Sequence, residues 1–267
     1  MKTKKYYNPK VSILVANYNN EKFLKRAINS LLNQSYKNIE IIVHDDRSTD
    51  TSLSILETYK KKIIIIKNKK KIGIGSYDQM NGYYKALQRS SGDIIFFLDS
   101  DDCYKLSKIS TFVDIYKQSS KNYLIDKPYA FFNQKRKGKI VITDRNNFVT
   151  PWPRFSPQSC ISIKREFFLR AYKTISIKKF PTIWMDFRLA TYIFFLDGRL
   201  EIMKDYLTYY QQLDNSASSN YARYSKNWWI RRYEAHQYCR YLKKKLNKSY
   251  FITIDYIITR MINLFIK

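Results

Sequence analysis

Short apolar runs alternate with amphipathic segments along the first hundred residues of the chain. The apolar runs, which predict buried strands, cover residues 11–16, 39–43, 63–66 and 93–98. Between these runs, apolar positions recur every three or four residues, which predicts helices near residues 24–31, 53–59 and 78–90. Strands and helices that alternate in this way connect by right-handed crossovers, so we expect an α/β fold with a mostly parallel sheet and helices on both faces.

The pattern is less regular between residues 105 and 220. It predicts strands at residues 129–133 and 139–143 on either side of a turn at Gly138, a strand at 160–164, a helix at 182–196, and short strands near 200–203 and 207–211. Runs of strands that follow a half made of alternating strands and helices indicate an α/β domain extended on one side by a mixed sheet.

The composition of the chain changes near residue 220. Residues 221–267 contain eleven Lys or Arg, two acidic residues and eleven aromatic residues. On a helical wheel, residues 250–267 separate into two arcs, which predicts an amphipathic helix. The polar arc holds Asp255, Thr259, Arg260, Asn263 and Lys267, and the apolar arc holds Ile254, Ile257, Ile258, Met261, Ile262 and Phe265. Such a helix packs either on its own domain or on lipid, and the sequence leaves both open.

The charge of the chain points to anionic partners. The 267 residues include 49 Lys and Arg against 22 Asp and Glu, a formal net charge of +27, which attracts nucleic acid, nucleotides or an anionic membrane surface. The three cysteines are far apart and only two histidines occur, which excludes a recognisable zinc site and favours a reducing compartment. The sequence shows neither a signal-peptide core nor an apolar run of transmembrane length. We therefore expect a cytoplasmic protein, peripheral on the inner face of the cytoplasmic membrane if it binds lipid.

Polar residues follow three of the predicted strands. They form the segments Asn17-Tyr18-Asn19, residues 44–50, and Asp99-Ser100-Asp101-Asp102. Because the carboxyl ends of parallel strands meet at one edge of a sheet, these segments converge on one crevice. Their acids and aromatic ring suit a nucleotide. Tyr18 can stack on a base, Asp46 can accept a hydrogen bond from an imide N–H, and a metal ion on Asp101 can neutralise a diphosphate.

These segments resemble the inverting family 2 glycosyltransferases, which have the GT-A fold. The resemblance is carried by residues 11–19, 34–36, 40–50 and 92–102, the last of which matches the D-x-D strand end of the family. It extends over about residues 9–215. It implies one GT-A, Rossmann-like domain at residues 1–220, with a nucleotide-binding half at about 9–104 and an acceptor half at about 105–220. A basic, aromatic and helical tail follows at 221–267.

The resemblance also implies roles for individual residues. It implies that the nucleotide-sugar is bound by Ala16, Tyr18, Asp46, Asp99 and Ser100, and that Asp101 is a ligand of Mn²⁺ or Mg²⁺. The segment Trp184-Met185-Asp186-Phe187-Arg188 resembles the acidic motif before a helix in this family, which implies that Asp186 is the catalytic base.

The activity implied by the resemblance is that of an inverting, metal-dependent hexosyltransferase of cell envelope polysaccharide biosynthesis. Its sugar donor would be a nucleotide-sugar, a UDP-sugar first of all. Its acceptor would be a hydroxyl group of a surface glycan or of a lipid-linked glycan.

Two positions depart from the family pattern. Many members have an Arg-Asn pair in the helix before the fourth strand, where this chain has Tyr83-Tyr84. Arg89 or the lysines at 69–71 are then the candidates for contacts with phosphate. Members also often have a histidine after the final strand, where this chain has Gln212, a poor metal ligand. These departures keep open a glycosyltransferase-like protein without catalytic activity.

Other interpretations of the same residues stay open. Asp45 and Asp46 can merely begin a helical turn, and Asp50 is more typical of a helix cap than of a ligand. Asp186 can form a structural salt bridge with Arg188 or with another residue. The charge and aromatic content also suit a basic nucleic-acid-binding protein, although the lysines are dispersed and no recognition motif is present. A nucleotidyltransferase is disfavoured because the loop after the first strand has no glycine.

Overall fold

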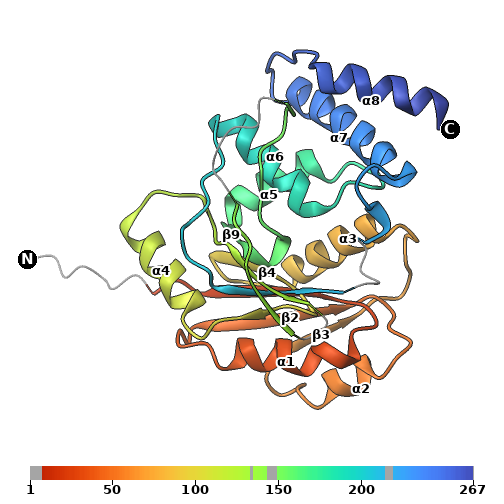
Figure 1. Cartoon of the computed structure of the whole chain (residues 1–267). Coiled ribbons are helices and arrows are strands. Elements are labelled where there is room, and N and C mark those ends of the chain that lie inside the picture. Colours follow the sequence, from red (N-terminus) through yellow and green to blue (C-terminus); the bar gives the residue numbers. More distant parts are fainter. Residues whose placement is uncertain (1–7, 133–134, 143–148, 214–218, 267) are drawn as a thin grey trace, which may run out of the picture.

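A six-stranded sheet forms the centre of the molecule (Figure 1). The computed structural model describes residues 8–132, 135–142, 149–213 and 219–266. The strands of this sheet are β1 (Val11–Asn17), β2 (Ile39–Asp45), β3 (Ile64–Lys67), β4 (Ile94–Asp99), β6 (Tyr123–Ile125) and β9 (Ile161–Lys164). Their order is β3-β2-β1-β4-β9-β6. The first four pair in parallel, whereas β9 runs antiparallel to both of its neighbours, β4 and β6.

Helices cover both faces of this sheet. One face carries α1 (Glu21–Leu32), α2 (Ser52–Glu57) and α4 (Lys108–Gln118), and the other carries α3 (Gly75–Gln88), α5 (Arg165–Ile175) and α6 (Met185–Asp197). Successive side chains of a strand point to opposite faces of the sheet. Ile13 and Phe96 pack toward the first layer of helices, and Leu14 and Phe97 pack toward the second. All four side chains are fully buried. Burial on both faces explains why these strands are apolar along their whole length.

A second, smaller sheet has the order β5-β10-β7-β8. Its strands are β5 (Cys103–Tyr104), β7 (Pro128–Phe132), β8 (Lys135–Lys139) and β10 (Thr208–Gln212), and short 3₁₀ helices lie at η1 (Gln158–Cys160) and η2 (Ser219–Tyr221). The fully buried ammonium group of Lys108 connects this sheet to the rest of the domain. Its Nζ donates to Asp126 Oδ1 (3.0 Å), to Thr208 Oγ1 (2.6 Å) and to a backbone carbonyl of η1.

Two helices complete the chain. α7 (Lys226–Lys245) packs against α5 and α6 through Tyr238, Cys239 and Leu242, and α8 (Ile254–Phe265) lies outermost (Figure 1). α8 is the amphipathic helix predicted in the tail, and it packs on its own domain through the polar arc, because Thr259 and Asn263 are buried. Position 267 of that arc lies outside the described residues. Among the helices of the described ranges, none combines the length and the apolar character that a membrane crossing requires.

The predicted α/β fold is confirmed, whereas two predicted strands of the middle region are wrong. The strand expected at 139–143 forms at Lys135–Lys139 instead, so Gly138 lies inside the strand opposite Ala130 and not in a turn. Residues 200–203, which are all described, form no strand; they are an irregular segment that buries Leu200 and Ile202. Alternating apolar residues mark burial, and a buried irregular segment shows the same pattern as a strand. Positions 133 and 143 of the predicted strands lie outside the described residues.

Candidate active site

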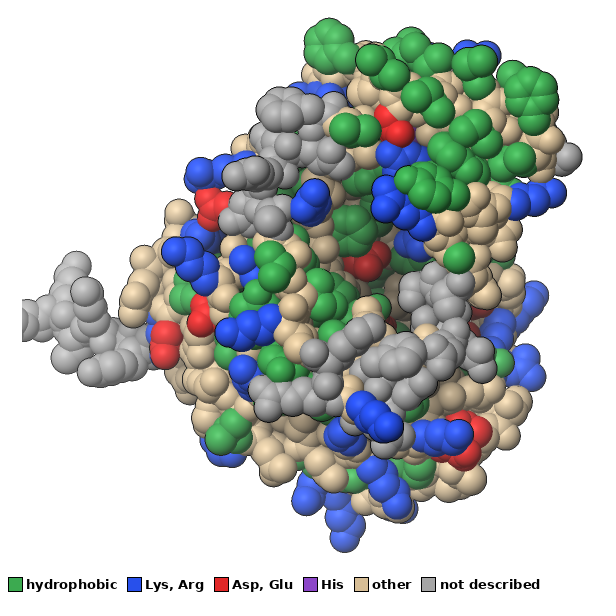
Figure 2. Space-filling model, in the orientation of Figure 1, with side chains coloured by type: hydrophobic (Ala, Val, Ile, Leu, Met, Phe, Trp, Pro, Cys, Tyr) green, Lys and Arg blue, Asp and Glu red, His purple; other side chains and the backbone are tan. Residues whose placement is uncertain are grey.

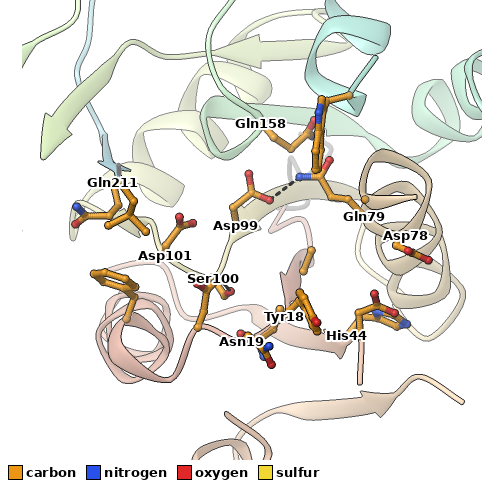
Figure 3. A pocket seen from close by; sticks show the side chains of 18 of the residues that line it. Tyr18, Asn19, His44, Asp78, Gln79, Asp99, Ser100, Asp101, Gln158 and Gln211 are labelled. Carbon is orange, nitrogen blue, oxygen red and sulfur yellow. Dashed lines mark hydrogen bonds between the residues drawn. The ribbon is translucent and has the colours of Figure 1, made fainter. Parts of the chain in front are cut away.

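A cavity of about 1190 Å³ lies at the carboxyl ends of β1, β2 and β4 (Figure 3). From β1, the chain adds β2 and then β3 on one side of the sheet, and it adds β4 on the other side. The direction in which strands are added therefore reverses between β1 and β4. Such a reversal is where open α/β sheets bind ligands. All seven residues to which the family resemblance gives a binding or catalytic role line this cavity: Ala16, Tyr18, Asp46, Asp99, Ser100, Asp101 and Asp186. The cavity is large enough for a nucleotide with an attached sugar.

Asp99 is held in place at the end of β4 by two side chains of α3. It accepts hydrogen bonds from Gln79 Nε2 (2.9 Å, dashed in Figure 3) and from the hydroxyl group of Tyr83 (2.8 Å). Burial, followed by the charge of Asp101, raises the pKa of Asp99 to about 7. Burial also raises the pKa of Asp101 to about 6. The two carboxyl groups therefore share a site that penalises their negative charges.

Arg26 of α1 joins the end of β4 to β10 of the second sheet. Its Nη2 donates to the backbone carbonyl of Asp101 (2.9 Å) and to Oε1 of Gln211 (3.0 Å). The backbone N–H of Gln211 in turn donates to Oδ1 of the fully buried Asp102 (2.7 Å). Burial, and then the charges of Asp101 and Asp99, raises the pKa of Asp102. This side of the cavity is thus built from two sheets and one helix.

The acidic end of β4 fits a divalent cation. No group of three His, Cys, Asp or Glu side chains in the described ranges forms a complete metal site. A cation that bridges phosphate groups needs only one or two protein carboxylates, however, because phosphates and water supply its other ligands. Asp101 and Asp99 are two such carboxylates, and a positive charge beside them would relieve the repulsion that raises the pKa of Asp99. The residues present therefore fit Mn²⁺ or Mg²⁺.

The opposite end of the lining holds an aromatic ring, a lysine and a carboxylate. Nζ of Lys71 lies 3.1 Å from the centre of the Tyr18 ring and 3.8 Å from Oδ2 of Asp46. Asp46 also accepts a short hydrogen bond from Nδ2 of Asn68. Tyr18 is 48% exposed although it is aromatic, and it lines the cavity (Figure 3). A flat ring beside an acceptor carboxylate is an arrangement that can receive a nucleobase.

Asp186 enters the cavity from the first turn of α6. Burial raises its pKa, and the charge of Arg231, which comes from α7 and also lines the cavity, opposes that effect. The alternative of a salt bridge with Arg188 is wrong. The buried guanidinium of Arg188 instead donates to the backbone carbonyls of Ile175, Ile177, Phe180 and Ile183. Through these hydrogen bonds, Arg188 holds the loop before α6 in place and fixes the start of the helix that carries Asp186.

Several buried polar atoms of the lining have no hydrogen-bond partner within the described part of the chain. They are Oδ1 of Asn17, Nε2 of His44, Oε1 of Gln79, and both polar atoms of the Gln158 side chain. Buried polar groups are ordinarily paired, and leaving one unpaired costs about 1–3 kcal/mol. A ligand with many hydroxyl, amide or phosphate groups would satisfy these atoms.

Several residues of the site had no role assigned from the sequence, among them Gln79, Gln158, Gln211 and Arg231, and Tyr83 was named only as a departure from the family pattern. Gln79 and Tyr83 are four residues apart on α3, so helical spacing alone could have paired them. At the Tyr83-Tyr84 departure, Tyr83 turns inward to Asp99 whereas Tyr84 stacks on Tyr172. The sequence around Gln158 and Gln211 has no pattern that predicts a place in the site, because only tertiary packing brings these two residues to the cavity.

The structure also places the other polar residues that were discussed from the sequence. Gln211, rather than Gln212, lines the cavity, and Lys71 does so rather than Arg89, which ends α3. Asp50 is a structural cap, as expected: it accepts hydrogen bonds from the backbone N–H groups of Glu21 (3.0 Å) and Ser52 (2.9 Å). Asp45 serves the turn after β2 by accepting from Ser48, whereas Asp46 faces the cavity.

Comparisons with known proteins point to one family. Residues 12–179 match the family model described as glycosyl transferase family 2. The Escherichia coli protein WfaP, a UDP-Glc:alpha-D-GlcNAc-diphosphoundecaprenol beta-1,3-glucosyltransferase, is 39% identical over 126 residues, which cover 45% of this chain and 48% of WfaP. The matched part of this chain spans between a third and a half of the length of the first curated relatives.

Two solved structures have the same fold. TarS (residues 1–349) of S. aureus in complex with UDP-GlcNAc has a TM-score of 0.64 and 19% identity over 95% of this chain and 70% of TarS. The mannosyltransferase PcManGT from Pyrobaculum calidifontis, in complex with GDP-Man and Mn²⁺, has a TM-score of 0.57 and 15% identity over 98% of this chain and 70% of PcManGT. The fold is GT-A, and the family match covers more than half of the chain. The chain belongs to glycosyl transferase family 2.

Proposed function

We propose that this glycosyltransferase inverts the anomeric centre of a sugar as it moves that sugar from a nucleotide-sugar, first of all a UDP-sugar, to an acceptor hydroxyl. The observation that carries the proposal is the meeting in one cavity of the acidic end of β4, the pair Tyr18 and Asp46, and Asp186. The complexes of TarS with UDP-GlcNAc and of PcManGT with GDP-Man and Mn²⁺ support a nucleotide-sugar donor.

The nucleotide would occupy the half of the domain at about residues 9–104. Tyr18 would flank the base, and Asp46 would accept the imide N–H in place of its present partner, Asn68. Ala16, Asp99 and Ser100, at the ends of β1 and β4, would contact the ribose and the diphosphate. Lys71, 3.1 Å from the Tyr18 ring centre, adds a positive charge at the same end of the cavity.

Asp186 would act as the base of the transfer. Its carboxylate takes the proton of the acceptor hydroxyl while that oxygen forms a bond to the anomeric carbon. The bond from the anomeric carbon to the diphosphate oxygen breaks on the opposite side, and its electron pair leaves with the nucleotide. A raised pKa makes Asp186 a stronger base than an ordinary aspartate.

Asp101, together with Asp99, would hold Mn²⁺ or Mg²⁺. When bound there, the cation supplies a positive charge that stabilises the departing diphosphate. The hydrogen bonds from Gln79 and Tyr83 keep the Asp99 carboxylate oriented for this task.

The acceptor half would lie at about residues 105–220, which supply Gln158, Asp186 and Gln211 to the cavity. The name of WfaP, with its diphosphoundecaprenol substrate, supports a lipid-linked glycan as acceptor. A surface glycan is the second choice, and cell envelope polysaccharide biosynthesis is the context of both. The tail at 221–267 contributes Arg231 to the same cavity, and the formal charge of +27 favours an anionic membrane as the place of reaction.

The test measures sugar transfer and hydrolysis of the sugar donor across a set of nucleotide-sugars in the presence of Mn²⁺. We expect the wild-type protein to turn over at least one UDP-sugar, and Asp101→Ala to lose about a hundredfold or more of that rate. The matched control is Asp114→Ala, which removes an exposed aspartate of α4. It should behave like the wild type. Equal turnover by wild type and Asp101→Ala would refute the proposal.

A further inference from the structure

The outermost helix, α8, turns its polar side inward. Nδ2 of the buried Asn263 donates to the backbone carbonyl of Trp229 (3.0 Å). Asp255 accepts from Nη2 of Arg232 (2.6 Å), and its Oδ2 lies 2.7 Å from Nε2 of His236. These contacts from both ends of the helix to α7 fix its rotation. In most surface helices the apolar side faces the protein, so this orientation is the reverse of the ordinary one.

The apolar side of α8 is therefore exposed. We call it the α8 face, and it consists of Phe251, Ile252, Ile254, Ile257, Ile258, Met261, Leu264 and Phe265. Phe265 is 85% exposed and Ile254 78% exposed. Figure 2 shows these side chains as a continuous apolar surface over the outermost helix, bordered by Lys and Arg. A contiguous apolar patch of this kind marks an interaction surface, since isolated apolar residues are the normal case.

Within the described part of the tail, the exposed charges beside the α8 face have one sign. The tail has two acidic residues, and both are engaged on the inside: Asp255 with α7, and Glu234 with the backbone N–H (2.9 Å) and hydroxyl (2.7 Å) of Thr182. Its exposed cations are Arg223, Lys226, Arg240, Lys244, Lys245, Lys248 and Arg260. An apolar helix face within a field of cations is complementary to anionic headgroups above a hydrocarbon layer.

We propose that the α8 face inserts into the surface of an anionic lipid bilayer and holds the enzyme there. With twelve residues, α8 is about 18 Å long, which is too short to span the hydrocarbon core, so it lies in the plane of the interface. A second copy of the chain is a poorer occupant. A symmetric contact would bring two equally cationic tails together, and their repulsion opposes pairing.

The same helix that holds α8 also reaches the active-site cavity. Arg232 of α7 binds Asp255 of α8, and the adjacent Arg231 lines the cavity beside Asp186. Docking of the α8 face would thus place the acceptor side of the cavity near the bilayer. The benefit of membrane binding rests on the proposed function. The α8 face would be the surface that brings a lipid-linked acceptor within reach of the cavity.

The experiment is co-sedimentation of the full chain with vesicles of equal parts phosphatidylglycerol and phosphatidylcholine. The test variant carries Ile257→Gln, Met261→Gln, Leu264→Gln and Phe265→Gln, which remove apolar surface without changing charge. The control variant carries Leu106→Gln, Leu169→Gln and Leu196→Gln at exposed apolar positions outside the tail. We expect the wild type and the control to bind, and the test variant to bind about tenfold or more weakly. Vesicles of phosphatidylcholine alone should also bind the wild type more weakly.

Two results would overturn the proposal: a wild-type protein that stays in the supernatant, or a test variant that binds as well as the wild type. A concentration-dependent dimer in light scattering, lost in the test variant while vesicles bind neither protein, would instead make the α8 face a contact between copies. The vesicle assay contains neither sugar donor nor acceptor, so its outcome is independent of transfer. Retained hydrolysis of the sugar donor in both variants shows that the cavity is intact.

Discussion

Asp186 and Arg231 are the residue pair whose charges set the acceptor side of the cavity. Burial raises the pKa of Asp186, and Arg231 counteracts this because a nearby positive charge stabilises the carboxylate. As the proposed base, Asp186 must be deprotonated to act, so we expect the rate of transfer to fall as the pH drops through its pKa. We therefore expect the acidic limb of the pH profile to lie above the 3.8 of an unperturbed aspartate.

Asp186→Asn should lower transfer by about a hundredfold or more and leave nucleotide binding intact, because it removes only the base. The measurements are transfer rate and the thermal shift produced by UDP with Mn²⁺. Asp197→Asn, at the exposed other end of α6, is the control and should be close to wild type. Arg231→Gln should move the acidic limb to higher pH. An unmoved limb, or an active Asp186→Asn protein, contradicts the role of base.

The residues at the ends of the strands were the easiest to predict from the sequence. Once the four apolar runs are identified, the rule for ligand sites at parallel strand ends places Tyr18, Asp46, Asp99 and Asp101 at one edge. Their gathering around the cavity was therefore within reach of the sequence. Gln158 was not, because it sits in a 3₁₀ helix whose position depends on the packing of distant segments.

At the scale of elements, the buried pair Lys108 and Asp126 joins α4 to both sheets. Lys108 Nζ lies 3.0 Å from Asp126 Oδ1 and 2.6 Å from Thr208 Oγ1 of β10, while Asp126 Oδ2 accepts from the backbone N–H of Leu207 (2.9 Å). The middle elements were predicted less well than the first half for the same reason. Their register depends on such long-range contacts and not on local periodicity.

Lys108→Met should lower the free energy of unfolding by about 3–5 kcal/mol, because it leaves the buried Asp126 carboxylate without its cation. Denaturant unfolding measures the change. Lys117→Met, which removes a surface partner of Asp114 from the same helix, should change stability by less than about 1 kcal/mol. Adding Asp126→Asn to Lys108→Met should recover part of the loss. A single variant as stable as the wild type would show that the pair does not hold the sheets together.

At the scale of the whole molecule, the pH dependence of stability includes a contribution from Glu40, at the end of the sheet away from the cavity. Burial raises the pKa of Glu40, but hydrogen bonds from Lys10, Ser12 and the backbone N–H of Ser91 outweigh this and lower it from 4.5 to about 2. Because the folded pKa lies below the unfolded one, this stabilisation is complete above about pH 4.5 and is lost as the pH falls through about 2.

Glu40→Gln should therefore reduce the free energy of unfolding by about 2 kcal/mol at neutral pH, a value discounted for partial exposure. The difference from wild type should shrink between pH 4.5 and 2, the two pKa values that bound the titration. Thermal or urea unfolding across that range provides the comparison. Glu57→Gln, which breaks an exposed pair with Lys67, is the control and should give a much smaller difference. A pH-independent loss in Glu40→Gln would mean that the charge of Glu40 is not what stabilises the strands.

The contacts of Arg26 have a consequence for the order in which the enzyme is assembled. This one side chain binds the carbonyl of Asp101, 75 positions later in the chain, and the side chain of Gln211, 185 positions later. The acidic edge of the cavity therefore cannot take its final form when only the first 104 residues have been synthesised. It is completed only when β10, the last strand in the described part of the chain, has left the ribosome and joined the second sheet. A nascent chain that stops before β10 has Asp99, Asp101 and Asp102 but not their finished arrangement.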